Sequence, residues 1–258
     1  MINLPDCTIS PTHARGLRRQ HDRWVAHKFA IWNPPGMPGR FGPRVRAEEA
    51  ELRALYGADH VLRVDCGKKE TLLYFVDRDE HDLYRLHVTM LKRRPDRISG
   101  RRGRLPVAAT AHAYERVIQG FARAGYDLVD VLHDVMETLF RDVGYERAPS
   151  APEDERDVWK RAGNAHVWLP QGLAIVVVPE RGDAVIRTVI AADGLIGKNR
   201  QLWEAMGKSG SKVSFQRAAP GVALTMRVPP ESPVTPSSST GRSATCRGSD
   251  CWHSGKAN

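Results

Sequence analysis

The sequence has few cysteines, no long apolar run and no apparent targeting segment. The cysteines, Cys7, Cys66, Cys246 and Cys251, are scattered over 258 residues. This pattern is typical of a reducing compartment and not of a disulfide scaffold. The longest apolar runs have the length of a β-strand, and the N-terminus has no basic start followed by an apolar core. We therefore expect a cytoplasmic protein with no membrane segment.

Several motifs that carry chemistry are also missing. The chain has no HExxH, GxSxG, phosphate-binding-loop or GxGxxG pattern, and no carboxylate cluster suited to Mg²⁺. These absences argue against a protease, a serine hydrolase, an NTPase and a metal-dependent nuclease. Cys246, Cys251 and His253 are potential metal ligands, but their spacing is not that of a zinc knuckle and no fourth ligand is nearby. We expect neither a metal nor a cofactor.

Positive charge is what the chain has in excess. Its formal net charge is +9, which favours RNA, DNA or an anionic membrane surface as a partner. Lys92 to Arg104 is the densest basic run and is interrupted by proline and glycine, so we expect a loop. This loop is either merely solvated, a flexible polycation that grips phosphates, or a nuclear localisation signal. The candidate RNA-binding residues in it are Lys92, Arg93, Arg94, Arg97, Arg101, Arg102 and Arg104.

The two ends of the chain differ from its middle. Residues 1–43 hold an Arg- and His-rich segment followed by a Pro/Gly loop. We interpret them as a basic arm that lies along a phosphate backbone, or alternatively as a solvated helix that packs Trp24 and Phe29. Residues 229–258 are rich in Pro, Ser, Thr and Gly and are expected to form a disordered tail.

Residues 44–105 are predicted to form a small α/β module. The pattern indicates a helix from Arg44 to Tyr56 that ends at Gly57, then strands over residues 60–66, 71–76 and 83–91 in an antiparallel meander. Period-two alternation places Arg85, His87 and Thr89 on one face of the last strand. That face is either a functional groove or an ordinary solvent face.

Residues 106–228 are predicted to pack a helical hairpin against a sheet. Thr110 caps a first amphipathic helix, whose polar stripe includes His112 and Arg116, and Asp127 caps a second helix. Apolar strands follow over residues 166–170, 173–178 and 184–190, then a short helix at 201–206 and one more hairpin. The expected fold class is α+β, with an antiparallel sheet packed against the helical hairpin.

The segment from about residue 106 to 191 resembles small metal-independent ribonuclease toxins. The likeness is to the RelE-like and colicin-like nucleases, which are grouped with barnase and EndoU, and covers about a third of the chain. It is carried by His112, Arg116, Asp130 and Val131 in the helices and by residues 185–190 in the last strand. This chain departs from the pattern because a further 67 residues follow Ala191. The resemblance implies an endoribonuclease that has RNA as its substrate and a cognate inhibitor as a possible partner protein.

Metal-free RNA cleavage needs a base, an acid and fixed cations around one phosphate. His112 and Arg116 lie one turn apart on one helix face and are expected to meet the same phosphate. Thr188 or Arg187 would complete the catalytic set, but adjacent strand residues point to opposite faces, so at most one of them belongs to it. Thr188 is expected on the face of Ile186 and Ile190. Lys160, close to Trp159, is a further candidate for RNA binding.

The ribonuclease hypothesis makes a geometric prediction. The strand that carries Thr188 should lie centrally in a sheet against which the helix from Thr110 packs. An alternative hypothesis is a non-catalytic nucleic-acid-binding protein of a phage or mobile element, which uses the N-terminal arm and the Lys92 to Arg104 run. A third is an interaction or assembly protein whose basic runs only keep it soluble.

Overall fold

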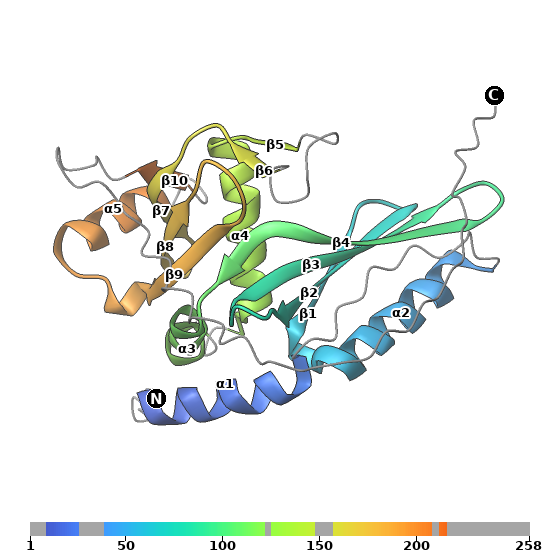
Figure 1. The fold of residues 1–258 in the computed structure, drawn as a ribbon, viewed down its shortest axis with the longest axis horizontal. Coiled ribbons are helices and arrows are strands. Elements are labelled where there is room, and N and C mark those ends of the chain that lie inside the picture. The colour runs from blue at the N-terminus through green and yellow to red at the C-terminus, as the bar shows by residue number, and fades with distance from the viewer. Residues whose placement is uncertain (1–8, 26–38, 122–124, 148–156, 208–211, 216–258) are drawn as a thin grey trace, which may run out of the picture. The chain divides into compact units, whose positions relative to one another are not determined.

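The computed structural model describes residues 9–25, 39–121, 125–147, 157–207 and 212–215 (Figure 1). The helices are α1 (Pro11–Val25), α2 (Phe41–Tyr56), α3 (Ala111–Gly120), α4 (Leu128–Asp142) and α5 (Gly197–Gly207), with short 3₁₀ turns η1 (Ala58–His60) and η4 (Ala192–Gly194). The strands are β1 (Val61–Asp65), β2 (Glu70–Arg78), β3 (Tyr84–Arg93), β4 (Ile98–Ala109), β5 (Tyr145–Arg147), β6 (Asp157–Trp159), β7 (Gly163–Leu169), β8 (Gly172–Val178), β9 (Ala184–Ala191) and β10 (Lys212–Phe215).

Eight of these strands form one sheet in the order β1-β2-β3-β4-β9-β8-β7-β10. Every neighbouring pair in it is antiparallel except β4 and β9, which run parallel over three residue pairs from Val107 and Ala184. The predicted α+β class is confirmed. The predicted meander and the hairpin of β8 and β9 are also present. The expected boundary between residues 105 and 106 falls inside β4, so the two predicted segments share one sheet.

The main core lies between this sheet and the helices α3 and α4. Tyr114 and Val117 of α3 and Leu132 of α4 are buried against Ile186 and Val189 of β9. The close approach of α3 requires Gly120, because a Cβ there would lie 2.6 Å from the Cβ of Ala191. Helix α4 also packs on β2, β4 and β7, so it spans the junction between the two halves of the sheet.

Helix α2 covers the opposite face of β2. Leu73 and Phe75 pack with Leu52 of α2, whereas Tyr74 and Val76 belong to the main core on the other side. This division follows from the alternation of side chains along a strand. The predicted helix up to Tyr56 is confirmed, and Gly57 ends it with φ +98°, a conformation that favours glycine.

The face of β3 that carries His87 is neither a groove nor a solvent face. His87 and Thr89 are buried under α2, and the ring of His87 stacks on Phe75 with centroids 5.5 Å apart. Arg85, two residues before His87 in β3, pairs with Asp79 and Asp183. The alternation was predicted correctly, but the helix that covers this face comes from a distant part of the chain.

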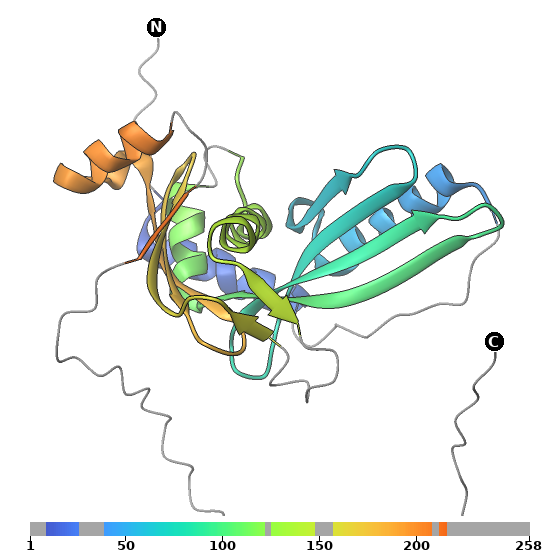
Figure 2. The same cartoon turned by 90° about the horizontal axis from the view of Figure 1, so that it is seen from above.

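The basic run from Lys92 to Arg104 is not a loop. It forms the end of β3, a tight turn and the beginning of β4, and in the turn the Arg94 N–H donates to the Arg97 carbonyl at 2.8 Å. The hairpin runs out away from α3 and α4 (Figures 1 and 2). Pairing with β3 supplies the backbone hydrogen bonds, and the charges of the run are divided between the two faces of the strand.

The N-terminal segment is a packed helix over the residues that are described. Ala14, His21 and Asp22 of α1 are buried, and α1 packs against α3. This arrangement agrees with the helical alternative for the segment and not with an extended arm. The Pro/Gly loop over residues 26–38 and the tail from residue 229 lie outside the described residues.

Candidate functional site

Helix α3 is fixed to β9 at its first residues. The Thr110 N–H donates to the Ile186 carbonyl at 3.0 Å, and the Thr110 hydroxyl donates to the Arg187 carbonyl at 3.1 Å. The same hydroxyl accepts from the Ala113 N–H at 3.1 Å, so Thr110 is the predicted N-cap. The strand that carries Thr188 is central in the sheet and α3 packs on it, as the ribonuclease hypothesis predicted.

The strand itself is irregular at the predicted site. Thr188 pairs with Ile175 and Ile186 pairs with Val176, so Arg187 is the extra residue of a β-bulge. The bulge reverses the alternation beyond this point. Thr188 therefore shares the face of Ile175, away from α3, and not the face of Ile186 as expected. The structure does not bring Thr188 to the side of the sheet on which His112 lies.

The other three predicted catalytic residues are exposed. His112 and Arg116 lie on the outer face of α3, and Arg187 projects from the bulge. Arg116 donates to Gln119 at 3.1 Å, one turn further along the same helix. His112 has no hydrogen-bond partner in the described part of the chain. Within the described ranges, no neighbouring group therefore fixes its ring orientation or tautomer.

A cluster of unpaired cations lies where two hairpins end at the same edge of the sheet. Lys68 and Lys69 come from the β1–β2 turn, Arg93 ends β3, and Arg94 and Arg97 come from the β3–β4 turn. All five side chains are exposed. The Arg93 N–H donates to the Lys69 carbonyl at 2.7 Å, which holds the two turns together. We call these five residues the basic tip. Among the described residues, none of the five has an ion-pair partner.

The other predicted RNA-binding residues are placed differently. Lys92 pairs with Glu70 at 2.8 Å, Arg104 with Asp183 at 3.0 Å and Lys160 with Glu146 at 3.0 Å. Arg101 is exposed on β4, next to the tip.

Arg102 is the clear exception, because it is only 8% exposed and donates to Glu48 at 2.9 Å and to Thr89 at 3.0 Å. It therefore belongs to the buried layer under α2. It does not belong to a phosphate-binding surface.

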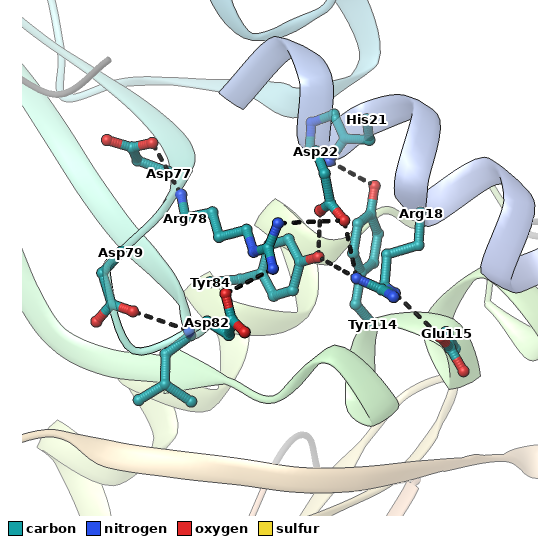
Figure 3. A network of polar contacts seen from close by, with 11 residues as sticks. Arg18, His21, Asp22, Asp77, Arg78, Asp79, Asp82, Tyr84, Tyr114 and Glu115 are labelled. Atoms are coloured by element: carbon teal, nitrogen blue, oxygen red, sulfur yellow. Dashed lines mark hydrogen bonds and ion pairs between the residues drawn. The ribbon is translucent and has the colours of Figure 1, made fainter. Parts of the chain in front are cut away.

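A second group of charges ties α1 to the rest of the fold (Figure 3). Arg18 donates to Asp22 at 2.8 Å, to the Tyr84 hydroxyl at 3.1 Å and to Glu115 of α3 at 3.0 Å. The Tyr84 hydroxyl donates to Asp22, and Arg78 pairs with the same carboxylate at 3.5 Å. Burial raises the pKa of Tyr84 above its usual range. This network is a structural joint between helix and sheet.

A cavity of about 1080 Å³ lies beside that network. Its lining comes from α1, from the end of α2 with η1 and β1, and from α3 and the start of α4. On its wall the His60 Nδ1–H donates to the carboxylate of Asp127, the residue that caps α4 in a reciprocal capping box with Asp130. The ring of His21 packs on that of His60, with centroids 3.7 Å apart. In the neutral imidazole with its proton on Nδ1, the His60 Nε2 is an acceptor.

The tautomer of His21 follows from its partners. Its Nε2 lies 3.3 Å from the Tyr56 carbonyl and must donate, so its Nδ1 accepts from the Tyr114 hydroxyl at 2.9 Å. Burial, with the adjacent imidazole of His60, lowers the pKa of His21 to about 4. His21 is therefore neutral at physiological pH and serves as a fixed wall of the cavity.

A scan against protein-family models found no match, and searches of curated proteins and of solved structures found no similar protein. None of the described helices is long and apolar enough to cross a membrane. Among the described residues, no group of three or more His, Cys, Asp or Glu side chains could hold a metal ion.

Two features of these sites were missed in the sequence. Lys68 and Lys69 fall between two predicted strands, and nothing local shows that this connection ends beside Arg93. His60 was placed in a strand, and the capping role of Asp127 gave no sign of a partner 67 residues away. Both features depend on tertiary contacts, and the predicted cap at Asp127 was the one visible signal.

Proposed function

We propose that the protein binds RNA through the basic tip. The observation that supports the proposal is the convergence of Lys68, Lys69, Arg93, Arg94 and Arg97 on two ordered turns with no acidic partner in the described residues. Exposed cations that are not neutralised by the protein attract phosphates and release their counterions. Ordered hairpins also lose less conformational freedom on binding than a flexible loop would.

The charge distribution separates this surface from the other basic residues. Arg102 and Arg104 are already neutralised by carboxylates, so they add little to the attraction of a phosphate backbone. Arg101 is exposed beside the tip and extends it along β4. The proposed surface is therefore smaller than the predicted basic run, and it includes two lysines from outside that run.

The salt dependence of RNA binding tests this function. Anisotropy of a short fluorescent single-stranded RNA should be measured between about 50 and 200 mM salt. If all five residues of the basic tip contact phosphates, log Kobs should fall with log[salt] with a slope of about −3.5 for a single strand. Binding that is insensitive to salt, or no binding, would refute the proposal. DNA of the same sequence shows whether the attraction is specific to RNA.

A second candidate function is metal-independent RNA cleavage of the toxin type. The observation that favours it is the anchoring of α3 on β9, which brings the helix of His112 and Arg116 against the bulge at Arg187. In this candidate His112 takes the 2′-hydroxyl proton and returns a proton to the leaving 5′-oxygen, while the two arginines neutralise the phosphate. Thr188 has no part in it, because it lies on the other face of the sheet.

Cleavage is tested by incubating the purified protein with total RNA in EDTA. Loss of activity in His112→Ala, with unchanged RNA binding, would support the second candidate. Activity that His112→Ala leaves intact would refute the role of this residue, and no cleavage at all would leave binding as the function. The proposal includes the cytoplasm as the compartment, supported by the few and scattered cysteines of the sequence. It also includes a cognate inhibitor as partner, if cleavage is found.

A further inference from the structure

The cavity beside His60 has no part in either candidate function. It is built from elements far apart in the sequence, and it is larger than a single aromatic ring requires. We propose that this cavity binds one unpaired nucleobase of the RNA, and that it prefers guanine. The identity of the ligand rests on the proposed RNA binding, whereas the shape and chemistry of the cavity do not.

Flat and apolar groups form the walls of the cavity. The imidazoles of His21 and His60 lie against each other, and the Tyr114 ring meets that of His21 edge-on with centroids 5.4 Å apart. Leu17, which is 38% exposed, and Tyr126 complete an apolar rim. Proteins that read single-stranded RNA stack splayed bases on such aromatic side chains.

The polar groups of the cavity are mostly hydrogen-bond acceptors. In the neutral imidazole of His60, whose Nδ1–H donates to the Asp127 carboxylate, Nε2 is an acceptor. The Asp59 carboxylate, from the same 3₁₀ turn, is exposed and has no hydrogen-bond partner among the described residues. Gln20 lines the wall on the α1 side and supplies an amide that can donate.

These groups select a base and exclude a phosphate. Asp59, Asp127 and Asp130 all line the cavity, and they repel an anion. Arg53 also lines it, but its guanidinium already donates to Glu49 at 3.0 and 3.1 Å and to the Ala58 carbonyl. The phosphates of a bound strand therefore stay outside the cavity.

Guanine fits this arrangement better than the other bases. Its Watson–Crick edge carries two adjacent donors, the ring N–H and the amino group, beside one carbonyl. Asp59 and His60, which are consecutive in η1 and line the cavity, supply two acceptors, and Gln20 of the same lining supplies a donor for the carbonyl. Uracil offers one ring N–H between two carbonyls, so a carboxylate on that edge would repel it.

Calorimetric titration of the full-length protein with the four nucleosides tests the proposal. Nucleosides carry no phosphate, so the basic tip does not contribute to their binding. Guanosine should bind most tightly and uridine most weakly. His60→Phe keeps a ring on the cavity wall but removes the acceptor, and should weaken guanosine binding about tenfold. Asp59→Asn, on an exposed turn, should also weaken guanosine binding. This variant tests the proposal if His60→Phe does not fold. His81→Phe, at an exposed histidine that does not line the cavity, is the matched control and should change nothing.

Equal affinity for all four nucleosides, or no binding of any of them, would overturn the proposal. Tighter binding of butylamine than of guanosine would also overturn it, because the acceptors would then serve an aliphatic amine. The RNA titration on the same variants separates the two claims. If RNA binding shows no salt dependence while guanosine still binds, the basic-tip function fails and the nucleobase site stands. If both RNA and nucleoside binding are absent, both fail.

Discussion

The hydroxyl of Thr110 joins the start of α3 to the backbone of Arg187. It donates to the Arg187 carbonyl at 3.1 Å and accepts from the Ala113 N–H at the same distance. One side chain therefore caps a helix and fixes that helix to the bulged strand of the sheet. The contact joins the helix that carries His112 to the strand that carries Arg187.

Removal of the Thr110 hydroxyl should destabilise the fold. We expect Thr110→Ala to lower the free energy of unfolding by about 1 to 2 kcal/mol, because an N-cap and a tertiary hydrogen bond are lost together. Thr110→Ser keeps the hydroxyl and should cost much less. Urea denaturation at neutral pH measures both. An alanine variant as stable as the serine variant would show that the hydroxyl contributes nothing.

The same substitution at two neighbouring arginines of β4 should affect different properties, stability at Arg102 and RNA binding at Arg101. Arg102→Met leaves Glu48 buried with the weaker partner Arg44, at 3.3 Å, and should destabilise the fold by about 3 kcal/mol. Arg101→Met, on the exposed face, should change stability by less than about 0.5 kcal/mol and should weaken RNA binding.

Denaturation and RNA titration of both variants check this pair of predictions. Equal stability of the two variants would contradict the structural role of Arg102. The double variant Glu48→Leu/Arg102→Met should recover part of the loss, because it leaves no unpaired buried charge.

The stability of the protein should fall on acidification through His21. The unfolded chain binds a proton at His21 below its ordinary pKa of 6.5, whereas the folded protein resists protonation until about 4. Neutral His21 therefore makes its full contribution to the free energy of unfolding above pH 6.5. About 3 kcal/mol of that free energy is lost as the pH falls to about 4. His21→Gln cannot titrate and should show a flatter curve over this range. Parallel curves for wild type and variant would refute this source of the pH dependence.

The sequence predicts much of the fold because its local signals agree with the tertiary structure. Thr110 and Asp127 are caps in both, and the alternation in residues 184–190 does predict a strand. The local signals fail where contacts with distant residues determine the structure of a segment. A run with seven basic residues forms a hairpin because the end of β3 pairs with the start of β4 and because Glu48 neutralises Arg102 from a helix 54 residues away.

The candidate site is predicted less well for the same reason. Period-two alternation assigns Thr188 to the face of Ile186, but the bulge at Arg187 reverses the pattern and no local residue signals it. The polar stripe of α3 is exposed, as its amphipathic pattern predicts. The pattern does not show which other parts of the fold lie near that stripe. His60 and Asp127 meet only when β1 and α4 are in place.

The salt dependence of RNA binding in two matched triple variants tests the central claim most directly. Arg93, Arg94 and Arg97 changed to Gln remove three charges from the basic tip, and Arg19, Arg23 and Lys198 changed to Gln remove three exposed charges elsewhere. We predict that the first variant lowers the magnitude of the salt slope by about 2 and weakens binding to every RNA sequence, while the second leaves the slope unchanged. Equal slopes in the two variants would contradict the assignment of the basic tip as the RNA-binding surface.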